Sequence, residues 1–376
     1  MRRNQTTRLT SASPSRPRIM AVGFALYLRK VLGLILLACN SDPMFAGDDS
    51  RIQVTADFSE AEAVVAILEK RHGKQAVTAA DWQALFATEP YQRLKQREAA
   101  MKRTFTDDDL KTFVLSVDLL SQCAALRSTV AAWKQADLKL DAMRILPYLP
   151  PESVIGAKIY PVIKPMHNSF VFEADTDPAI FLYVDPSVSR ESFANTVAHE
   201  MHHIGLSSVD KKYEGDIASL PDPAKAVAEW MGAFGEGEAM LAAAGGPDVD
   251  PVATGTLELK GNWARGKRDF NHDLEQVNAF FLDALSGTIQ GDAIREKASS
   301  FFGLQGPWYT VGYGMAVMVE KGYGRKSLIE CMRDRRLLLV RYNQLAEESN
   351  RKVGPWLALW SPEILKDVET PSQATK

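Results

Sequence analysis

The sequence predicts an α+β fold that is mostly helical and contains one small sheet. Between residues 153 and 184 the apolar pattern changes to short strand-like runs: Ile155 to Val162, Ser169 to Phe172 and Ile180 to Val184. Before and after this stretch, apolar residues recur at helical spacing. Hydrophobic residues make up 46% of the 376-residue chain, which is enough for a core of ordinary size.

The region from residue 51 to residue 148 is predicted to be helical. Ser59 to Glu62 has the spacing of a capping box, and Thr78 or Asp81 can cap the next helix. A longer helical pattern runs from Asp107 to Leu138. Three prolines then break the chain: Pro147, Pro150 and Pro151.

A five-residue motif, His199-Glu200-Met201-His202-His203, follows the last predicted strand. Residues four apart return to the same face of a helix, so His199 and His203 can offer two imidazole nitrogens to one metal ion. Glu200 can then act on a water held by that metal. Apolar neighbours predict a buried helix, and Gly205 is predicted to end it. The spacing therefore indicates a zinc site for metal-assisted hydrolysis of an amide bond.

A catalytic zinc usually has three protein ligands, so a third one must come from elsewhere. Leu206 and Val209 stand where a metzincin would have glycine and histidine, which excludes that class. A carboxylate is favoured over the only later histidine, His272. The candidates are Asp210, Glu214, Asp216, Glu229, Glu236 and Glu238.

Glu236 is the favoured third ligand. It lies in a predicted helix from Ala224 to Ala244 that carries few charges, where a buried glutamate needs a partner or a cation. Its neighbours three and four residues away are mostly small and would allow close approach of the His199–His203 helix. Glu238 faces bulkier residues, although both glutamates could also be solvated near a glycine-rich bend.

His199-Glu200-x-x-His203 followed by Glu236-Gly237-x-Ala239 resembles the gluzincin metallopeptidases, and further resembles a family of predicted bacterial zinc-dependent peptidases. Two aromatic segments add to the resemblance, Trp82 to Phe86 with Tyr91 and Trp308 to Gly314. The resemblance implies a zincin-like domain with Glu236 as the third zinc ligand. Met240 stands where thermolysin-type enzymes have an aspartate, so no partner for the ligands can be named.

Hydrolysis of an amide builds negative charge on the carbonyl oxygen, and a tyrosine or histidine often stabilises it. Tyr309 and Tyr313 are four residues apart on a predicted helix and are the candidate donors, with Tyr309 preferred. Core packing of both rings is the alternative, and His272 is a rival donor. His202 is expected to pack behind the site, because a fourth ligand would close it.

The first 46 residues are predicted to be an export leader. Basic residues precede the apolar run Val31 to Ala38, which is too short to span a bilayer. Lipidation of Cys39, which would attach the protein to a membrane, and ordinary cleavage after Ala46 both remain open. The location expected is the bacterial periplasm or cell envelope. Cys123 and Cys331 are either buried thiols or a disulfide.

The predicted organisation is therefore a leader (1–46), a helical region packed on the catalytic core (47–150), a zincin-like domain (151–366) and a polar tail (367–376). The function predicted is a zinc-dependent peptidase acting on peptide or protein substrates. An inactive peptidase-like scaffold or binding protein of the cell envelope, or a zinc amidase acting on cell-wall peptides, are the alternatives. A net charge of −3 without a basic stripe gives no support for nucleic-acid binding.

Overall fold

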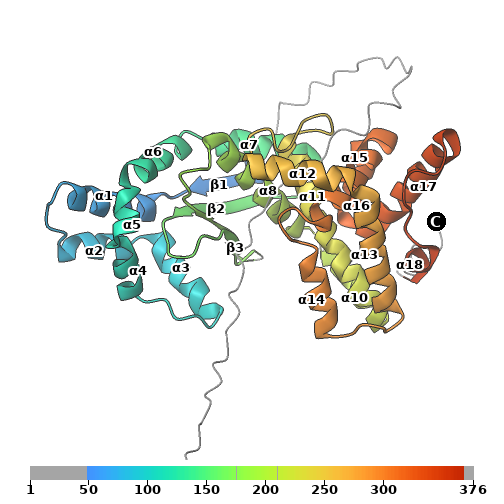
Figure 1. Ribbon diagram of the computed structural model, residues 1–376, viewed down its shortest axis with the longest axis horizontal. Coiled ribbons are helices and arrows are strands. Elements are labelled where there is room, and N and C mark those ends of the chain that lie inside the picture. The colour runs from blue at the N-terminus through green and yellow to red at the C-terminus, as the bar shows by residue number, and fades with distance from the viewer. Residues whose placement is uncertain (1–48, 175, 210, 368–376) are drawn as a thin grey trace, which may run out of the picture.

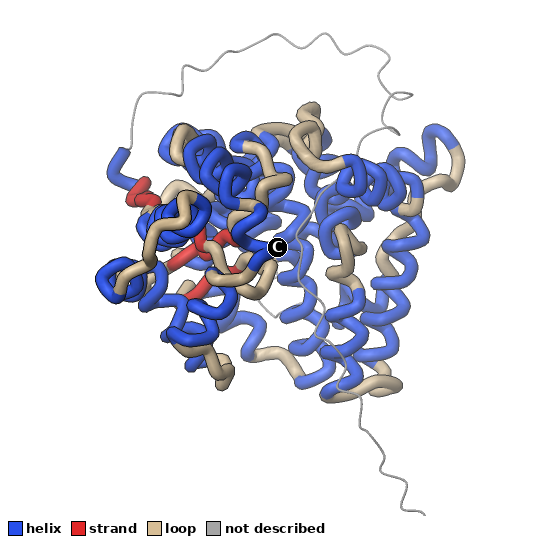
Figure 2. Tube along the Cα trace, turned by 60° about the vertical axis from the view of Figure 1, so that its left-hand side comes forward, coloured by secondary structure: helices blue, strands red, loops and turns tan. Residues whose placement is uncertain are grey.

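The computed structural model describes residues 49–174, 176–209 and 211–367 (Figure 1). The predicted leader with Cys39 and most of the predicted tail lie outside these residues. Helices dominate, and the few strands gather in one small sheet (Figure 2). The predicted α+β, mostly helical fold class is therefore confirmed.

The sheet has four strands in the order β1-β2-β4-β3. Its members are β1 (Ile52–Ala56), β2 (Ile155–Val162), β3 (Phe170–Phe172) and β4 (Ala179–Tyr183). β1, β2 and β4 are parallel, and β3 pairs antiparallel with β4. The prediction that residues 51 to 148 are entirely helical is wrong at β1, which is short and pairs with a strand about a hundred residues away. Because the partner strand is so distant, the five residues of β1 alone give little indication that they form a strand.

The N-terminal helices lie around the sheet, most of them at the left of the molecule in Figure 1. They are α1 (Ser59–His72), α2 (Ala79–Phe86), α3 (Glu89–Ala100), α4 (Asp107–Val114), α5 (Val117–Ser121), α6 (Cys123–Trp133) and α7 (Leu138–Ile145), with 3₁₀ turns at Asp49–Arg51 and Leu146–Tyr148. Thr78 caps α2, one of the two residues predicted to do so, and forms a capping box with Asp81. The box predicted at Ser59 is wrong, because Ser59 is already helical and its N–H donates to Asp57. The single helix predicted from Asp107 to Leu138 divides into three, since Ser116 caps a new helix.

Two helices in the middle of the chain carry the predicted metal ligands. They are α8 (Arg190–Ser207), which lies against β2, and α11 (Gly235–Ala244), which lies against α8. Gly205 does not end α8 as predicted. It lies within the helix, where the side chain of Leu149 occupies the space that a Cβ would need. The helix predicted from Ala224 to Ala244 is likewise interrupted by a 3₁₀ turn.

The remaining helices form the second half of the molecule and enclose a core rich in aromatic rings around Trp308. They are α9 (Lys211–Ala218), α10 (Asp222–Met231), η4 (Gly232–Phe234), α12 (Leu257–Arg268), α13 (Phe270–Leu285), α14 (Asp292–Ser300), α15 (Pro307–Tyr323), α16 (Arg325–Arg333), α17 (Arg335–Val353) and α18 (Pro362–Asp367). Among the described helices, none combines the length and the apolar character needed to cross a membrane. Cys123 and Cys331 are both buried free thiols.

Candidate metal centre

The helix α8 fixes the two histidines of the motif. The Ser189 hydroxyl caps it by accepting a hydrogen bond from the Ser192 N–H, and Phe193, Val197 and Met201 bury its apolar face. His199 and His203 are one turn apart, and their Nε2 atoms lie 3.1 Å from each other. His199 is only 3% exposed, whereas 28% of the His203 side chain is accessible. His199 is therefore enclosed by the protein, while His203 can be reached from solvent.

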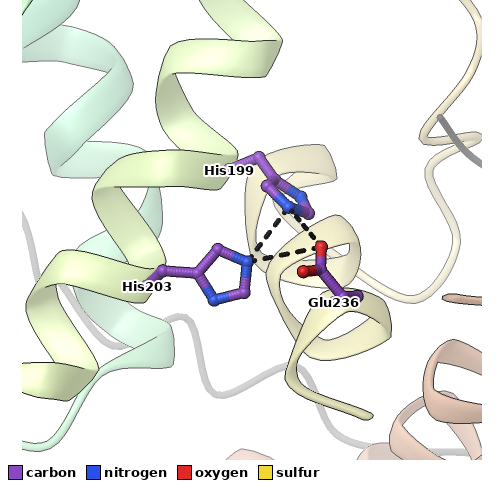
Figure 3. A group of neighbouring side chains, drawn as sticks. All are labelled: His199, His203 and Glu236. Atoms are coloured by element: carbon purple, nitrogen blue, oxygen red, sulfur yellow. Dashed lines mark hydrogen bonds and ion pairs between the residues drawn. The ribbon is translucent and has the colours of Figure 1, made fainter. Parts of the chain in front are cut away.

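Glu236 faces the two imidazoles from the first turn of α11 (Figure 3). Its Oε2 atom lies 3.1 Å from His199 Nε2 and 3.6 Å from His203 Nε2. Among the described residues, these three form the only group of histidine, cysteine or acidic side chains with ligand atoms close enough to share a metal ion. The structure thus brings together the three ligands predicted from the sequence.

The three ligand atoms fit a zinc ion in spacing and in chemistry. In a tetrahedral site with bonds of about 2.0–2.1 Å, neighbouring ligand atoms are about 3.3–3.4 Å apart. The separations of 3.1, 3.1 and 3.6 Å lie on either side of that value. Two imidazole nitrogens and one carboxylate oxygen are also a donor set that catalytic zinc uses, leaving a fourth position open.

Electrostatics shift the proton-binding equilibria of Glu236 and His203 in opposite directions. Burial would raise the pKa of Glu236, but the facing imidazoles outweigh it and hold the pKa of that carboxyl well below its usual range. Burial opposes protonation of His203, yet the carboxylate of Glu236 outweighs this effect and raises the pKa of that imidazole. Glu236 is thus ionised, the form that binds a metal, whereas His203 would give up its proton when a cation takes the proton's place beside the carboxylate.

Glu200, the second residue of the motif, is 5% exposed. Burial raises its pKa, while the positive potential of His199 and His203 works in the opposite direction. A carboxylate with a higher pKa is a stronger base than an ordinary surface glutamate.

A close crossing of α11 and α15 sets the position of Glu236. A Cβ on Gly237 would lie 2.1 Å from the backbone nitrogen of Tyr313, and one on Gly312 would lie 2.6 Å from the carbonyl oxygen of Phe234. Only glycine allows two backbones to approach so closely. The small residues three and four positions from Glu236 were expected to let α11 approach α8, and the two helices are in contact. Gly237 was not part of that expectation and packs against α15.

The two tyrosines predicted as donors occupy different surroundings on α15. The ring of Tyr309 stacks on the imidazole of His199, with centroids 6.4 Å apart and planes inclined by 21°. Tyr313 lies one turn further on, where its hydroxyl is 3.5 Å from the Val249 carbonyl oxygen and its ring packs edge-on against Trp263. Tyr309 is thus beside the two histidines, whereas these two contacts of Tyr313 are with a loop residue and a core residue.

The other candidates lie away from the three ligands or have other partners. Glu238 is fully buried, with Oε2 3.2 Å from Arg335 Nε. Glu229 is exposed, Asp216 belongs to α9, and the side chains of Asp210 and Glu214 lie outside the described residues. His272, the rival donor, is exposed on α13 beside Gln276.

His202 lies behind the ligand pair and is completely buried. Its Nε2 is 3.4 Å from the carbonyl oxygen of Tyr148, and burial holds the pKa of this imidazole well below its usual value. The Nδ1 atom of His199 is also buried, with no hydrogen-bond partner among the described residues. A carboxylate orienting this ligand, as many zinc sites have, is therefore not seen in the described part of the chain.

Sequence reasoning missed Arg335, Gly237 and Gly312, which fix α11 from two sides. Arg335 is 97 residues away from Glu238 and gives no local signal. The glycines did give a local signal, because glycines at short intervals on each of two helices are typical of helices that cross closely.

Comparison with known proteins gives the family. The family described as "Putative zinc dependent peptidase (DUF5700)" matches residues 82–351, more than two thirds of the chain. The chain belongs to this family. The match spans α8, α11 and α15, and hence all the residues described above. No curated protein and no solved structure matches the chain.

Proposed function

We propose that the protein hydrolyses peptide bonds with a zinc ion held by His199, His203 and Glu236. The observation that carries this proposal is the convergence of the three ligand atoms to separations of 3.1–3.6 Å, which a tetrahedral zinc site requires. The description of the family as zinc-dependent peptidases supports it independently. The arrangement of two histidines on one helix and a glutamate on another is that of the gluzincins, which the sequence resembles.

Glu200 is the general base in this proposal. When bound, zinc supplies a water with a pKa of about 7 and polarises the scissile carbonyl. The Glu200 carboxylate takes the proton of the attacking water and afterwards delivers it to the nitrogen of the leaving amine. Its burial and its raised pKa support this role, since a higher pKa makes the carboxylate a stronger base toward the attacking water.

Tyr309 is the preferred donor to the carbonyl oxygen as negative charge develops on it. Its ring stacks on His199, which supports a hydroxyl positioned near the reacting group. Tyr313 is proposed less strongly, because its hydroxyl is near the carbonyl oxygen of Val249.

The substrates we propose are peptides or proteins met in the bacterial periplasm or cell envelope. Support comes from the leader alone, where basic residues precede an apolar run ending at Cys39. Lipidation at Cys39 would hold the enzyme at a membrane surface.

Metal content and cleavage together test the proposal. Purified wild type should bind one zinc per chain, His203→Ala should bind much less, and Glu200→Gln should retain the metal. Wild type should cleave members of a peptide library, and Glu200→Gln should be at least about a hundredfold slower. Zinc binding without cleavage of any peptide would favour the scaffold alternative. Cleavage confined to cell-wall peptides would favour the amidase.

A further inference from the structure

Glu238 is the second glutamate of α11, two residues after the proposed ligand Glu236. Residues two apart on a helix point to nearly opposite faces, so Glu238 faces away from the histidines. Its side chain is completely buried, and Oε2 lies 3.2 Å from Arg335 Nε. A carboxylate buried to this extent requires a cationic or hydrogen-bonding partner, and Arg335 provides one.

Arg335 is the first residue of α17, and only 8% of its side chain is exposed. Its guanidinium also lies against the first turn of α11, because a Cβ on Gly235 would be 3.0 Å from Arg335 Nη2. The same guanidinium therefore contacts residues on both sides of Glu236. It holds the helical turn that carries the ligand, rather than the ligand itself.

The two sides of α11 are fixed by different means. On one side, the backbone of Gly237 packs directly on α15. On the other, the buried pair restricts both rotation and sliding of the helix, because an arginine–carboxylate bond has a narrow preferred geometry. Well-packed apolar side chains often replace a buried ion pair without loss of stability, so the pair is better explained by the geometry it imposes.

We propose that the Glu238–Arg335 pair is a positioning device for the third metal ligand, holding α11 so that Glu236 Oε2 meets both imidazoles. The inference rests on the zinc site proposed above. Glu238 and Arg335 are positioning residues here, and neither contacts the substrate. Their removal should alter metal binding before it alters folding.

A double variant, Glu238→Met with Arg335→Met, removes both charges and fills the space with apolar side chains. Zinc affinity, measured by competition with a chromophoric chelator, should fall about 10-fold to 100-fold. The visible absorption of the Co²⁺-substituted protein should change as well, because it reports the ligand geometry directly. The thermal midpoint of the metal-free protein should stay close to that of wild type.

Two further variants keep the inference testable. Glu238→Gln retains the shape and a neutral hydrogen bond to Arg335, so it should lose less zinc affinity than the double variant, about threefold to tenfold. Arg93→Met is the matched control. Arg93 is equally buried at 7% side-chain exposure, but it pairs with Glu173 and Asp177 in the β3–β4 connection. It should lower stability and leave zinc affinity unchanged.

The outcomes separate this inference from the proposed function. A wild-type protein that binds no zinc would refute the proposed site. Suppose that wild type binds zinc and that the double variant folds, binds zinc with the same affinity and has the same Co²⁺ spectrum. This result would refute the positioning role and leave the proposed site standing. If the double variant does not fold, a Glu238→Gln protein indistinguishable from wild type in both measurements would refute it.

Discussion

Replacing Gly237 by alanine tests how strictly the α11–α15 crossing sets the metal site. The added Cβ would lie 2.1, 2.5 and 2.6 Å from backbone atoms of Tyr313, Gly312 and Tyr309. None of these atoms can rotate away, as a side chain could. Ordinary contacts begin near 3.4 Å, so the two backbones must separate by about 1.3 Å.

Such a separation is large compared with what a metal site tolerates. Metal–ligand distances hold to within about 0.2 Å, and Glu236 is the residue directly before Gly237. We expect zinc affinity to fall at least about tenfold, comparable to the loss of a supporting partner of the ligands. Overpacking should also lower the free energy of unfolding by about 1–3 kcal/mol, partly offset by the higher helix propensity of alanine.

The assay is zinc competition with a chelator, combined with urea unfolding of the metal-free protein. Gly232→Ala is the matched control, because its Cβ would meet nothing within 4 Å and its φ of −53° suits alanine. The control should bind zinc normally and unfold at the same or slightly higher urea concentration. Equal behaviour of the two variants, or a Gly237→Ala protein with unchanged zinc affinity and stability, would refute the reasoning.

Three other predictions concern single side chains. Tyr309→Phe should lower kcat about 10²-fold to 10³-fold in peptide cleavage without changing zinc affinity, and an unchanged kcat would remove Tyr309 from the mechanism. Burial raises the pKa of Glu60 from 4.5 to about 8. The unfolded chain therefore releases this proton at a lower pH than the native protein does. As pH rises from 4.5 to 8, the free energy of unfolding should fall. Urea titrations at several pH values should show that the free energy of unfolding falls less with pH in Glu60→Gln than in wild type. Identical pH profiles of the two proteins would contradict the raised pKa of Glu60. Burial raises the pKa of the Cys331 thiol to about 12. A thiol reagent at pH 8 should therefore modify Cys331 only when urea unfolds the protein, as measured by mass spectrometry. Rapid labelling of Cys331 in the native protein would contradict this prediction.

The residues of the candidate metal site could be predicted because their positions are encoded locally. The four-residue spacing of His199 and His203 on one helix is visible in any sequence, and Glu236 was found as a charge in an otherwise apolar helix. The strands β2, β3 and β4 were predicted to within a residue or two for a similar reason, since each is a short apolar run bounded by turn residues.

Features that depend on distant contacts could not be predicted. The role of Gly205 depends on Leu149, which lies outside its helix and fills the space beside it. Glu238 pairs with Arg335, which lies 97 residues further along the chain. From the sequence, Glu236 and Glu238 could therefore be ranked as the third ligand only by the residues next to them. The surroundings of Tyr309 and Tyr313 likewise depend on how α15 crosses α11, which no local pattern reveals.

Strand β1 has a consequence for the order in which the chain can fold. Ile52 pairs with Ile155, so β1 leaves the ribosome about a hundred residues before its partner strand, a delay of about 5–20 s at ordinary rates of synthesis. During that interval the backbone groups of β1 have no sheet to join, and α1 and α3 emerge before β2, against which they later pack. Closing so long a loop is entropically unfavourable until β2 arrives. A nascent chain halted before residue 162 should therefore remain protease-sensitive throughout, and acquire resistance only once β2 has emerged.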